Sequence, residues 1–244
     1  MVFAPETARP NSTTVGMAGL QDIEVRAADG LPLLAWWLPP GPGQPVMLYL
    51  HGNGGNLDNR APRVRAFAGR GWGMLLLEWR GYGGNSGAPS EAGFLDDARG
   101  AMAHLMAQGF GPEWVMLYGE SIGSGFAVRL ATEYPVAAVV LESPYTSIAD
   151  LARRQMPFVP VGLLLRDPVE VLSHIGQVRA PLLIMRGMQD RVVPAAMGQT
   201  LYAAAREPKR LWTVEAAGHD DLLEHGMGDA VTAFIHEHVA AARP

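Results

Sequence analysis

One stretch of the sequence decides the fold: W-V-M-L-Y-G-E-S-I-G, residues Trp114–Gly123. Its apolar start, Trp114–Tyr118, predicts a buried strand, and the residues Ile122–Glu133 predict a helix. A serine between a strand and a helix, with glycines two positions to either side, is typical of a strained turn that exposes the hydroxyl. Larger side chains at the glycine positions would collide with neighbouring backbone. The motif therefore predicts that Ser121 is a nucleophile, against the alternative of an ordinary glycine-lined turn.

Short apolar runs alternate with helical patterns along the rest of the chain, which is typical of a largely parallel sheet with helices on both faces. An antiparallel hairpin is expected first, because Asp29-Gly30 separates the runs Ile23–Ala27 and Leu33–Leu38. The other strands are expected at Val46–Leu50, Met74–Glu78, Ala138–Leu141, Leu182–Arg186 and Leu211–Glu215. The other helices are expected at Asn59–Arg70, Ser90–Gln108, Ala195–Ala205 and Asp229–Ala242.

The whole chain, residues 1–244, is interpreted as a single α/β domain with an N-terminal extension over residues 1–19. Residues 146–179 form a longer connection than a simple crossover needs, and they contain the apolar run Phe158–Leu165. This segment is either a core-packing excursion or a short cap whose apolar face covers a binding site. We expect the cap, which is too short to be a separate lid domain.

Composition excludes several classes of protein. The 48% hydrophobic and 18% charged residues are typical of a globular protein. A net charge of −5 without a basic stripe argues against a nucleic-acid partner. The absence of cysteine excludes disulfides and thiol catalysis, and the histidine spacing matches no metal motif, so no metal or other cofactor is expected. No apolar run reaches the roughly 20 residues that cross a bilayer, and no signal-peptide pattern opens the chain, so we expect a cytoplasmic protein.

A serine hydroxyl needs a base to take its proton, and the base needs an acid to orient it. His219 is the expected base, because it follows the last predicted strand and a glycine that permits a sharp turn. Asp190 is the expected acid, because it follows the preceding strand at the sheet edge where α/β sites form. A helix-capping role is the alternative for Asp190, and Glu142 is the alternative acid. Among the other histidines, His104, His236 and His238 lie in predicted helices, His225 is expected near a helix start, and His174 lies in the connection 146–179.

The glycine-rich stretch His51–Asn56 follows the strand Val46–Leu50. Two backbone amides can stabilise the oxyanion of an acyl-transfer reaction, and we expect them to be the N–H groups of Asn53 and Ile122. A phosphate-binding loop is the alternative, but no Lys-Ser or Lys-Thr follows the glycines. His51 is interpreted as structural, holding the loop through hydrogen bonds.

Six motifs occur in a fixed order: His51–Asn56, Arg80–Gly83, Gly119–Gly123, Ser143–Tyr145, Gly187–Pro194 and Gly218-His219. This set resembles the α/β-hydrolase superfamily, and more closely its small serine hydrolases with little lid, which include protein depalmitoylase-like enzymes. The resemblance runs from Leu20 to the end of the chain. It implies an eight-stranded, mostly parallel sheet whose second strand is antiparallel. It also implies the triad Ser121, Asp190 and His219, and supports Asn53 and Ile122 as oxyanion donors.

The substrate is less well defined by the sequence. Leu57, Tyr82, Tyr145 and Phe158 are expected near the nucleophile, where they would line an apolar acyl pocket, although core packing is the alternative for each. No clustered arginines point to a strongly anionic substrate. We therefore expect a small or medium acyl ester or thioester, cleaved through an acyl-serine intermediate. An acyltransferase using the same triad and a non-catalytic binding module are the alternatives.

Overall fold

Eight strands form one sheet in the computed structural model, which describes residues 3–155 and 166–239. The strands are β1 (Gln21–Arg26), β2 (Pro32–Leu38), β3 (Val46–Leu50), β4 (Gly73–Leu77), β5 (Val115–Glu120), β6 (Ala138–Glu142), β7 (Leu182–Gly187) and β8 (Lys209–Val214). Their order in the sheet is β1-β2-β4-β3-β5-β6-β7-β8. The strand β2 runs antiparallel to both of its neighbours, and all later pairs are parallel. The expected hairpin, eight-stranded sheet and antiparallel second strand are thereby confirmed.

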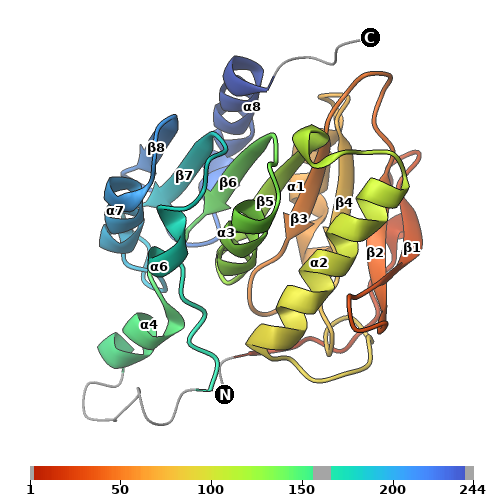
Figure 1. Cartoon of the computed structure of the whole chain (residues 1–244), viewed down its shortest axis with the longest axis horizontal. Helices are drawn as coiled ribbons and strands as arrows, with labels where there is room; N and C mark the ends of the chain where they lie inside the picture. The colour runs from red at the N-terminus through yellow and green to blue at the C-terminus, as the bar shows by residue number, and fades with distance from the viewer. Residues whose placement is uncertain (1–2, 156–165, 240–244) are drawn as a thin grey trace.

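Helices cover both faces of this sheet (Figure 1). On one face, α2 (Glu91–Ala107), α3 (Gly123–Glu133), α6 (Leu172–Ile175) and α7 (Ala195–Ala204) pack into one apolar cluster. On the other face, α1 (Ala61–Ala68) and α8 (Met227–His238) pack into a second cluster. Each cluster takes alternate side chains of the central strands, so β3, β4, β5 and β6 are buried along their whole length. This is why their sequences are continuously apolar.

Most element boundaries lie within two residues of those predicted. The helix α2 begins at Glu91 because the Ser90 hydroxyl accepts a hydrogen bond from the amide of Gly93 at 3.1 Å. The largest difference is at α8, which ends at His238 and not at the predicted Ala242. Among the strands, β5 continues to Glu120, two residues beyond the apolar run. A charged residue can end this buried strand because a buried arginine pairs with it, as described below.

Several short helices were not predicted: η1 (Ser12–Val15), η3 (Pro112–Trp114), α4 (Ile148–Gln155) and α6. By contrast, η2 (Leu57–Arg60) overlaps the start of the predicted helix Asn59–Arg70, and η4 (Leu222–His225) lies where a helix start was expected near His225. The helix η1 lies inside the expected extension, and α4 and α6 lie inside the segment 146–179. The apolar run Phe158–Leu165 is outside the described residues, so the cap and the single-domain division remain predictions. No helix within residues 3–155 and 166–239 is long and apolar enough to span a bilayer.

The parallel strands all end on the same side of the sheet, at the lower edge in Figure 1. The chain segment that follows Phe3 also lies along this edge (Figure 1). The edge therefore gathers the loops after β3, β5, β7 and β8, which carry most of the residues expected at the site.

Candidate active site

Ser121 lies in a strained turn between β5 and α3, with a φ of 47°. A β-carbon added at Gly119 would lie 2.6 Å from the Cα of Ser124, and one added at Gly123 would lie 2.0 Å from the carbonyl oxygen of Leu50. Both contacts are with backbone, which cannot move aside cheaply. The glycines are therefore required sterically, as the motif predicted.

Two hydrogen bonds fix the backbone of this turn. The amide of Ser121 donates to the carbonyl of Glu142 at 2.8 Å, which ties the turn to the neighbouring strand β6. The Ser124 hydroxyl donates to the carbonyl of Ser121 at 2.6 Å. Together they hold an otherwise unfavourable left-handed conformation.

His219 joins Ser121 to Asp190. Its Nε2 atom lies 3.1 Å from the Ser121 hydroxyl oxygen, and its Nδ1 atom lies 2.7 Å from Oδ2 of Asp190. Because a carboxylate can only accept, the proton of a neutral imidazole belongs on Nδ1, which leaves Nε2 free to accept from the serine. The structure therefore brings together the three side chains that the sequence singled out, from three different loops.

The Asp190 carboxylate is itself held in place. Its Oδ1 atom accepts hydrogen bonds from the amides of Val192 and Val193, each at 2.8 Å. The side chain of Asp190 is only 2% exposed, and that of His219 is 14% exposed. The backbone of His219 is also held, because the hydroxyl of Ser143, directly after β6, donates to the carbonyl of His219 at 3.3 Å.

The pKa of His219 lies above its usual value of 6.5. Burial acts to lower this pKa, but the hydrogen bond to Asp190 and the negative charge of Asp190 outweigh it. The positive form of the ring, which arises whenever it takes a proton, is thus stabilised by its neighbour.

The loop after β3 is built on His51 and Glu78. Both ring nitrogens of His51 are engaged: Nε2 lies 2.9 Å from Oε1 of Glu78, and Nδ1 lies 2.8 Å from the carbonyl of Gly52. The second oxygen of Glu78 accepts from the amide of Leu57 at 2.9 Å. These bonds give His51 the loop-holding position expected of it and leave it no free nitrogen to act as a base.

The side chain of Asn53 is held in place by two hydrogen-bond donors from other residues. Its Oδ1 atom accepts from the hydroxyl of Tyr82 at 2.7 Å and from the amide of Ala4 at 2.9 Å. The Ala4 amide also lies 3.2 Å from the Tyr82 hydroxyl oxygen. Burial raises the pKa of Tyr82 to about 12, so this hydroxyl keeps its proton and remains a donor at neutral pH.

The loop of Asn53 lies beside the turn of Ser121. The strands β3 and β5 are parallel neighbours, with Leu50 opposite Gly119. A β-carbon at Gly52 would lie 2.9 Å from Oε1 of Glu120, which places the loop directly over the residue before the nucleophile. Asn53 and Ile122 therefore come from adjacent segments at the same edge of the sheet.

Two buried ion pairs lie beneath this edge, and the sequence pattern did not predict either of them. Arg60 pairs with Glu120, and Arg63 pairs with Glu142. Tyrosines complete both pairs, because the Tyr49 hydroxyl donates to Glu120 and the Tyr118 hydroxyl donates to Glu142, each at 2.6 Å. Glu142 is thus occupied elsewhere, and the carboxylate that accepts the hydrogen bond from His219 Nδ1 is Asp190, not the alternative acid. The one indication of these ion pairs in the sequence is a glutamate, Glu120 or Glu142, at the end of each of two buried strands.

Of the four residues expected to line an acyl pocket, three are buried and the fourth lies outside the described residues. Leu57 is fully buried in the apolar cluster of α1 and α8. Tyr82 and Tyr145 are also buried, and the Tyr145 hydroxyl donates to the carbonyl of Ile122 at 3.2 Å. Phe158 lies outside the described residues. Contact of these side chains with a substrate remains a prediction.

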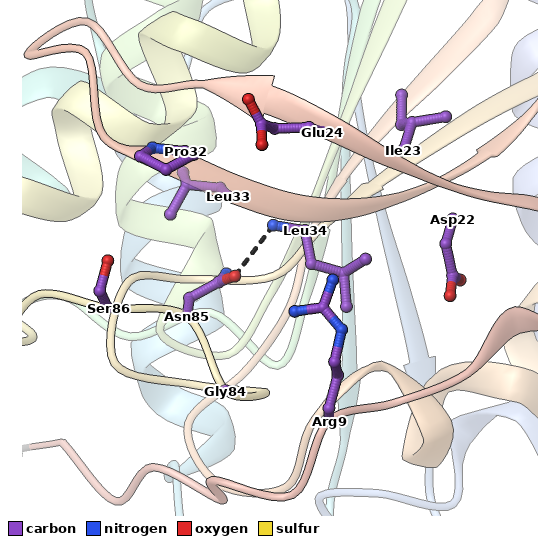
Figure 2. Close-up of a pocket in the computed structure, with 10 residues that line it drawn as sticks. All are labelled: Arg9, Asp22, Ile23, Glu24, Pro32, Leu33, Leu34, Gly84, Asn85 and Ser86. Atoms are coloured by element: carbon purple, nitrogen blue, oxygen red, sulfur yellow. Dashed lines mark hydrogen bonds between the residues drawn. The ribbon is translucent and has the colours of Figure 1, made fainter.

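A separate pocket of about 440 Å³ lies between the hairpin β1–β2 and the loop that follows Tyr82 (Figure 2). Its wall includes Arg9, Asp22 and Asn85, and the Asn85 side chain accepts from the amide of Leu34 at 2.9 Å (Figure 2). None of Ser121, Asp190 and His219 lines this pocket, so it is distinct from the triad.

Comparison with known proteins agrees with the observed fold. Residues 45–171 match the family model described as alpha/beta hydrolase fold. The chain is 40% identical to an uncharacterized protein of Mycobacterium tuberculosis, over 93% of this chain and 83% of that protein. It is 30% identical to the uncharacterized protein YfhR of Escherichia coli, over 91% of this chain and 81% of that one. Among solved structures, an esterase of Pyrococcus furiosus is similar with a TM-score of 0.80 and 18% identity, covering 98% and 97% of the two chains, which shows a shared fold.

Proposed function

Because the chain belongs to the α/β-hydrolase family, we propose that it is a serine hydrolase that cleaves carboxylic ester or thioester bonds of small to medium acyl substrates. The observation that carries this proposal is the continuous hydrogen-bonded path from Ser121 through His219 to Asp190. Ordinary loop packing has no need to align a strained serine, an imidazole and a buried carboxylate. The esterase structures that share the fold support the same class of reaction.

The reaction begins when the Ser121 oxygen attacks the carbonyl carbon of the substrate. His219 takes the serine proton on Nε2, and Asp190 stabilises the resulting imidazolium through Nδ1. The carbonyl oxygen becomes negative, and the N–H groups of Asn53 and Ile122 stabilise it. When the tetrahedral intermediate collapses, the bond to the leaving group breaks, and His219 gives its proton to the departing alcohol or thiol.

Water completes the cycle. His219 removes a proton from a water molecule, whose oxygen attacks the acyl-Ser121 carbonyl and forms a second tetrahedral intermediate. Collapse of this intermediate releases the carboxylic acid and returns the proton to Ser121. Every proton transferred in the proposed cycle passes through Nε2 of His219, and Asp190 stabilises the ring while it carries the extra proton.

Labelling with a fluorophosphonate and turnover of an acyl series test the proposal. The wild-type protein should become labelled at Ser121 and should hydrolyse p-nitrophenyl esters or acyl thioesters, with a rate that depends on acyl length. The Ser121→Ala variant should lose labelling and at least about 1000-fold in kcat. Full activity of Ser121→Ala would defeat the proposal. Products formed with added alcohol or amine acceptors would reveal acyl transfer, and a wild-type protein that never reacts would be a binding module.

A further inference from the structure

A single guanidinium joins the loop of Asn53 to the turn of Ser121. Arg60 is at the end of η2, and its side chain is buried between the two segments. Its Nε and Nη2 atoms donate to the two oxygens of Glu120 at 3.1 and 2.9 Å. Its third nitrogen, Nη1, donates to the carbonyl of Gly54 at 3.0 Å. Arg60 therefore holds Glu120 with a planar two-pronged contact and holds the loop with its remaining nitrogen.

The two ends of this bridge lie next to the two amides that the proposed mechanism uses. Gly54 directly follows Asn53, and Glu120 is two residues before Ile122. We propose that Arg60 is a positioning residue that sets the spacing between the N–H groups of Asn53 and Ile122. This role rests on the proposed function, because the spacing matters only if both amides stabilise an oxyanion.

The surroundings of Arg60 favour a rigid bridge. Burial acts to raise the pKa of Glu120, but the charges of Arg60 and Arg63 outweigh it, so that pKa lies below its usual value and the carboxyl stays charged. The Tyr49 hydroxyl holds the same carboxylate at 2.6 Å. A β-carbon at Gly55 would lie 2.8 Å from Nη1 of Arg60, so the loop also packs closely on the guanidinium. A charge held this firmly can fix a loop to within the fraction of an ångström that catalysis requires.

The chain contains a matched control one helical turn away. Arg63 also pairs with a buried glutamate, and Glu142 is likewise held by a tyrosine. The hydrogen bonds described for Arg63 go to Glu142 and not to the loop of Asn53. Losing either arginine leaves a buried carboxylate without its positively charged partner. Only the loss of Arg60 also removes the guanidinium that joins the loop of Asn53 to the turn of Ser121.

The test compares Arg60→Met, Arg60→Lys and Arg63→Met in the full chain, with the substrate that the wild type turns over best. Arg60→Met should lower kcat roughly 10- to 100-fold while KM changes less than about threefold, because the amides act on the transition state. Binding of a trifluoromethyl ketone, which forms an oxyanion on Ser121, should weaken in parallel with kcat/KM. Arg60→Lys should recover part of kcat, and Arg63→Met should lower Tm similarly but reduce kcat clearly less than Arg60→Met does.

A second readout separates this inference from the proposed function. Amide hydrogen exchange of residues 52–56 should accelerate in Arg60→Met and stay unchanged in Arg63→Met, whether or not the protein turns over a substrate. Absence of fluorophosphonate labelling in the wild type would overturn the proposed function, while the exchange data would still decide whether Arg60 holds the loop. Unchanged kcat, or equal exchange in the two variants, overturns the inference. If Arg60→Met does not fold, Glu120→Gln keeps the shape of the pair and should show a smaller loss in the same parameters.

Discussion

At the residue scale, the contact of His219 with Asp190 both orients the imidazole ring and stabilises its protonated form. Asp190 fixes the ring through Nδ1 at 2.7 Å, and two backbone amides keep that carboxylate in place. The same carboxylate stabilises the protonated ring, which the proposed reaction forms transiently. Because the pKa of His219 is raised in the folded protein, protonation of this one ring affects both the rate of the proposed reaction and the free energy of unfolding.

The pH dependence of kcat/KM should show this link. Because the base must be neutral, activity should rise with pH through a midpoint above the usual 6.5 of histidine. The contribution of the His219–Asp190 pair to the free energy of unfolding should change in the opposite direction: it is full below the unfolded pKa and is lost as pH rises through the folded one. Steady-state kinetics and denaturant titrations between pH 5 and 9 would measure both curves.

Asp190→Asn provides the control for this prediction. The amide removes the charge and disfavours the productive tautomer, so kcat should fall on the order of 1000-fold or more and the midpoint should move to lower pH. A midpoint that stays at the wild-type value in Asp190→Asn would contradict the assignment of the shift to this carboxylate.

At the element scale, the turn between β5 and α3 depends on how closely α3 approaches β3. A β-carbon at Gly123 would meet the carbonyl oxygen of Leu50 at 2.0 Å, so any larger residue must push the helix away from the strand. Because the loop of Asn53 begins directly after Leu50, such a shift changes the relative position of the two proposed amide donors, Asn53 and Ile122.

Gly123→Ala should therefore be costly in two ways. We expect a loss of about 1–3 kcal/mol in the free energy of unfolding, from the overpacked contact. We also expect kcat to fall by more than the population of unfolded protein explains. Gly69→Ala is the control, since nothing lies within 4 Å of its β-carbon position. Equal stability of the two variants in urea titrations would show that the contact with Leu50 relaxes freely.

Local patterns explain which parts of the structure the sequence could predict. Continuous apolar runs and glycine spacing predicted the strands, the turn of Ser121 and its two partners, because each signal lies within about ten residues. The Arg60–Glu120 pair joins residues 60 positions apart and has no local pattern. The short helix α4 was not predicted, because the sequence pattern of only about two helical turns is hard to distinguish from that of a polar loop.

At the scale of the whole molecule, the first described residues help to build the site. Phe3 is buried against Phe94, with ring centroids 4.9 Å apart, and the amide of Ala4 donates to Asn53. Further along, the amide of Gly83 donates to the carbonyl of Glu6 at 2.8 Å. Residues 3–6 of the expected extension thus pack against the loops at the lower edge of Figure 1.

Phe3→Ala should lower the free energy of unfolding by about 1–3 kcal/mol, less than a central phenylalanine because the segment can fray. It should also reduce kcat and accelerate hydrogen exchange of the loop of Asn53. Phe110→Ala, which loses a ring contact with Trp37 of β2, should cost stability without changing kcat. If both variants have wild-type kcat, the segment stabilises the fold but does not tune the site.

The course of the leading segment also affects how the protein should be handled. A purification tag fused ahead of Phe3 would emerge beside the loop of Asn53, which Ala4 contacts, whereas α8 finishes at the opposite margin of the sheet (Figure 1). Assay constants measured with an amino-terminal tag would then mix the enzyme's own properties with interference from the fusion. A tag at the other end, or one cleaved before kinetics, avoids this artefact.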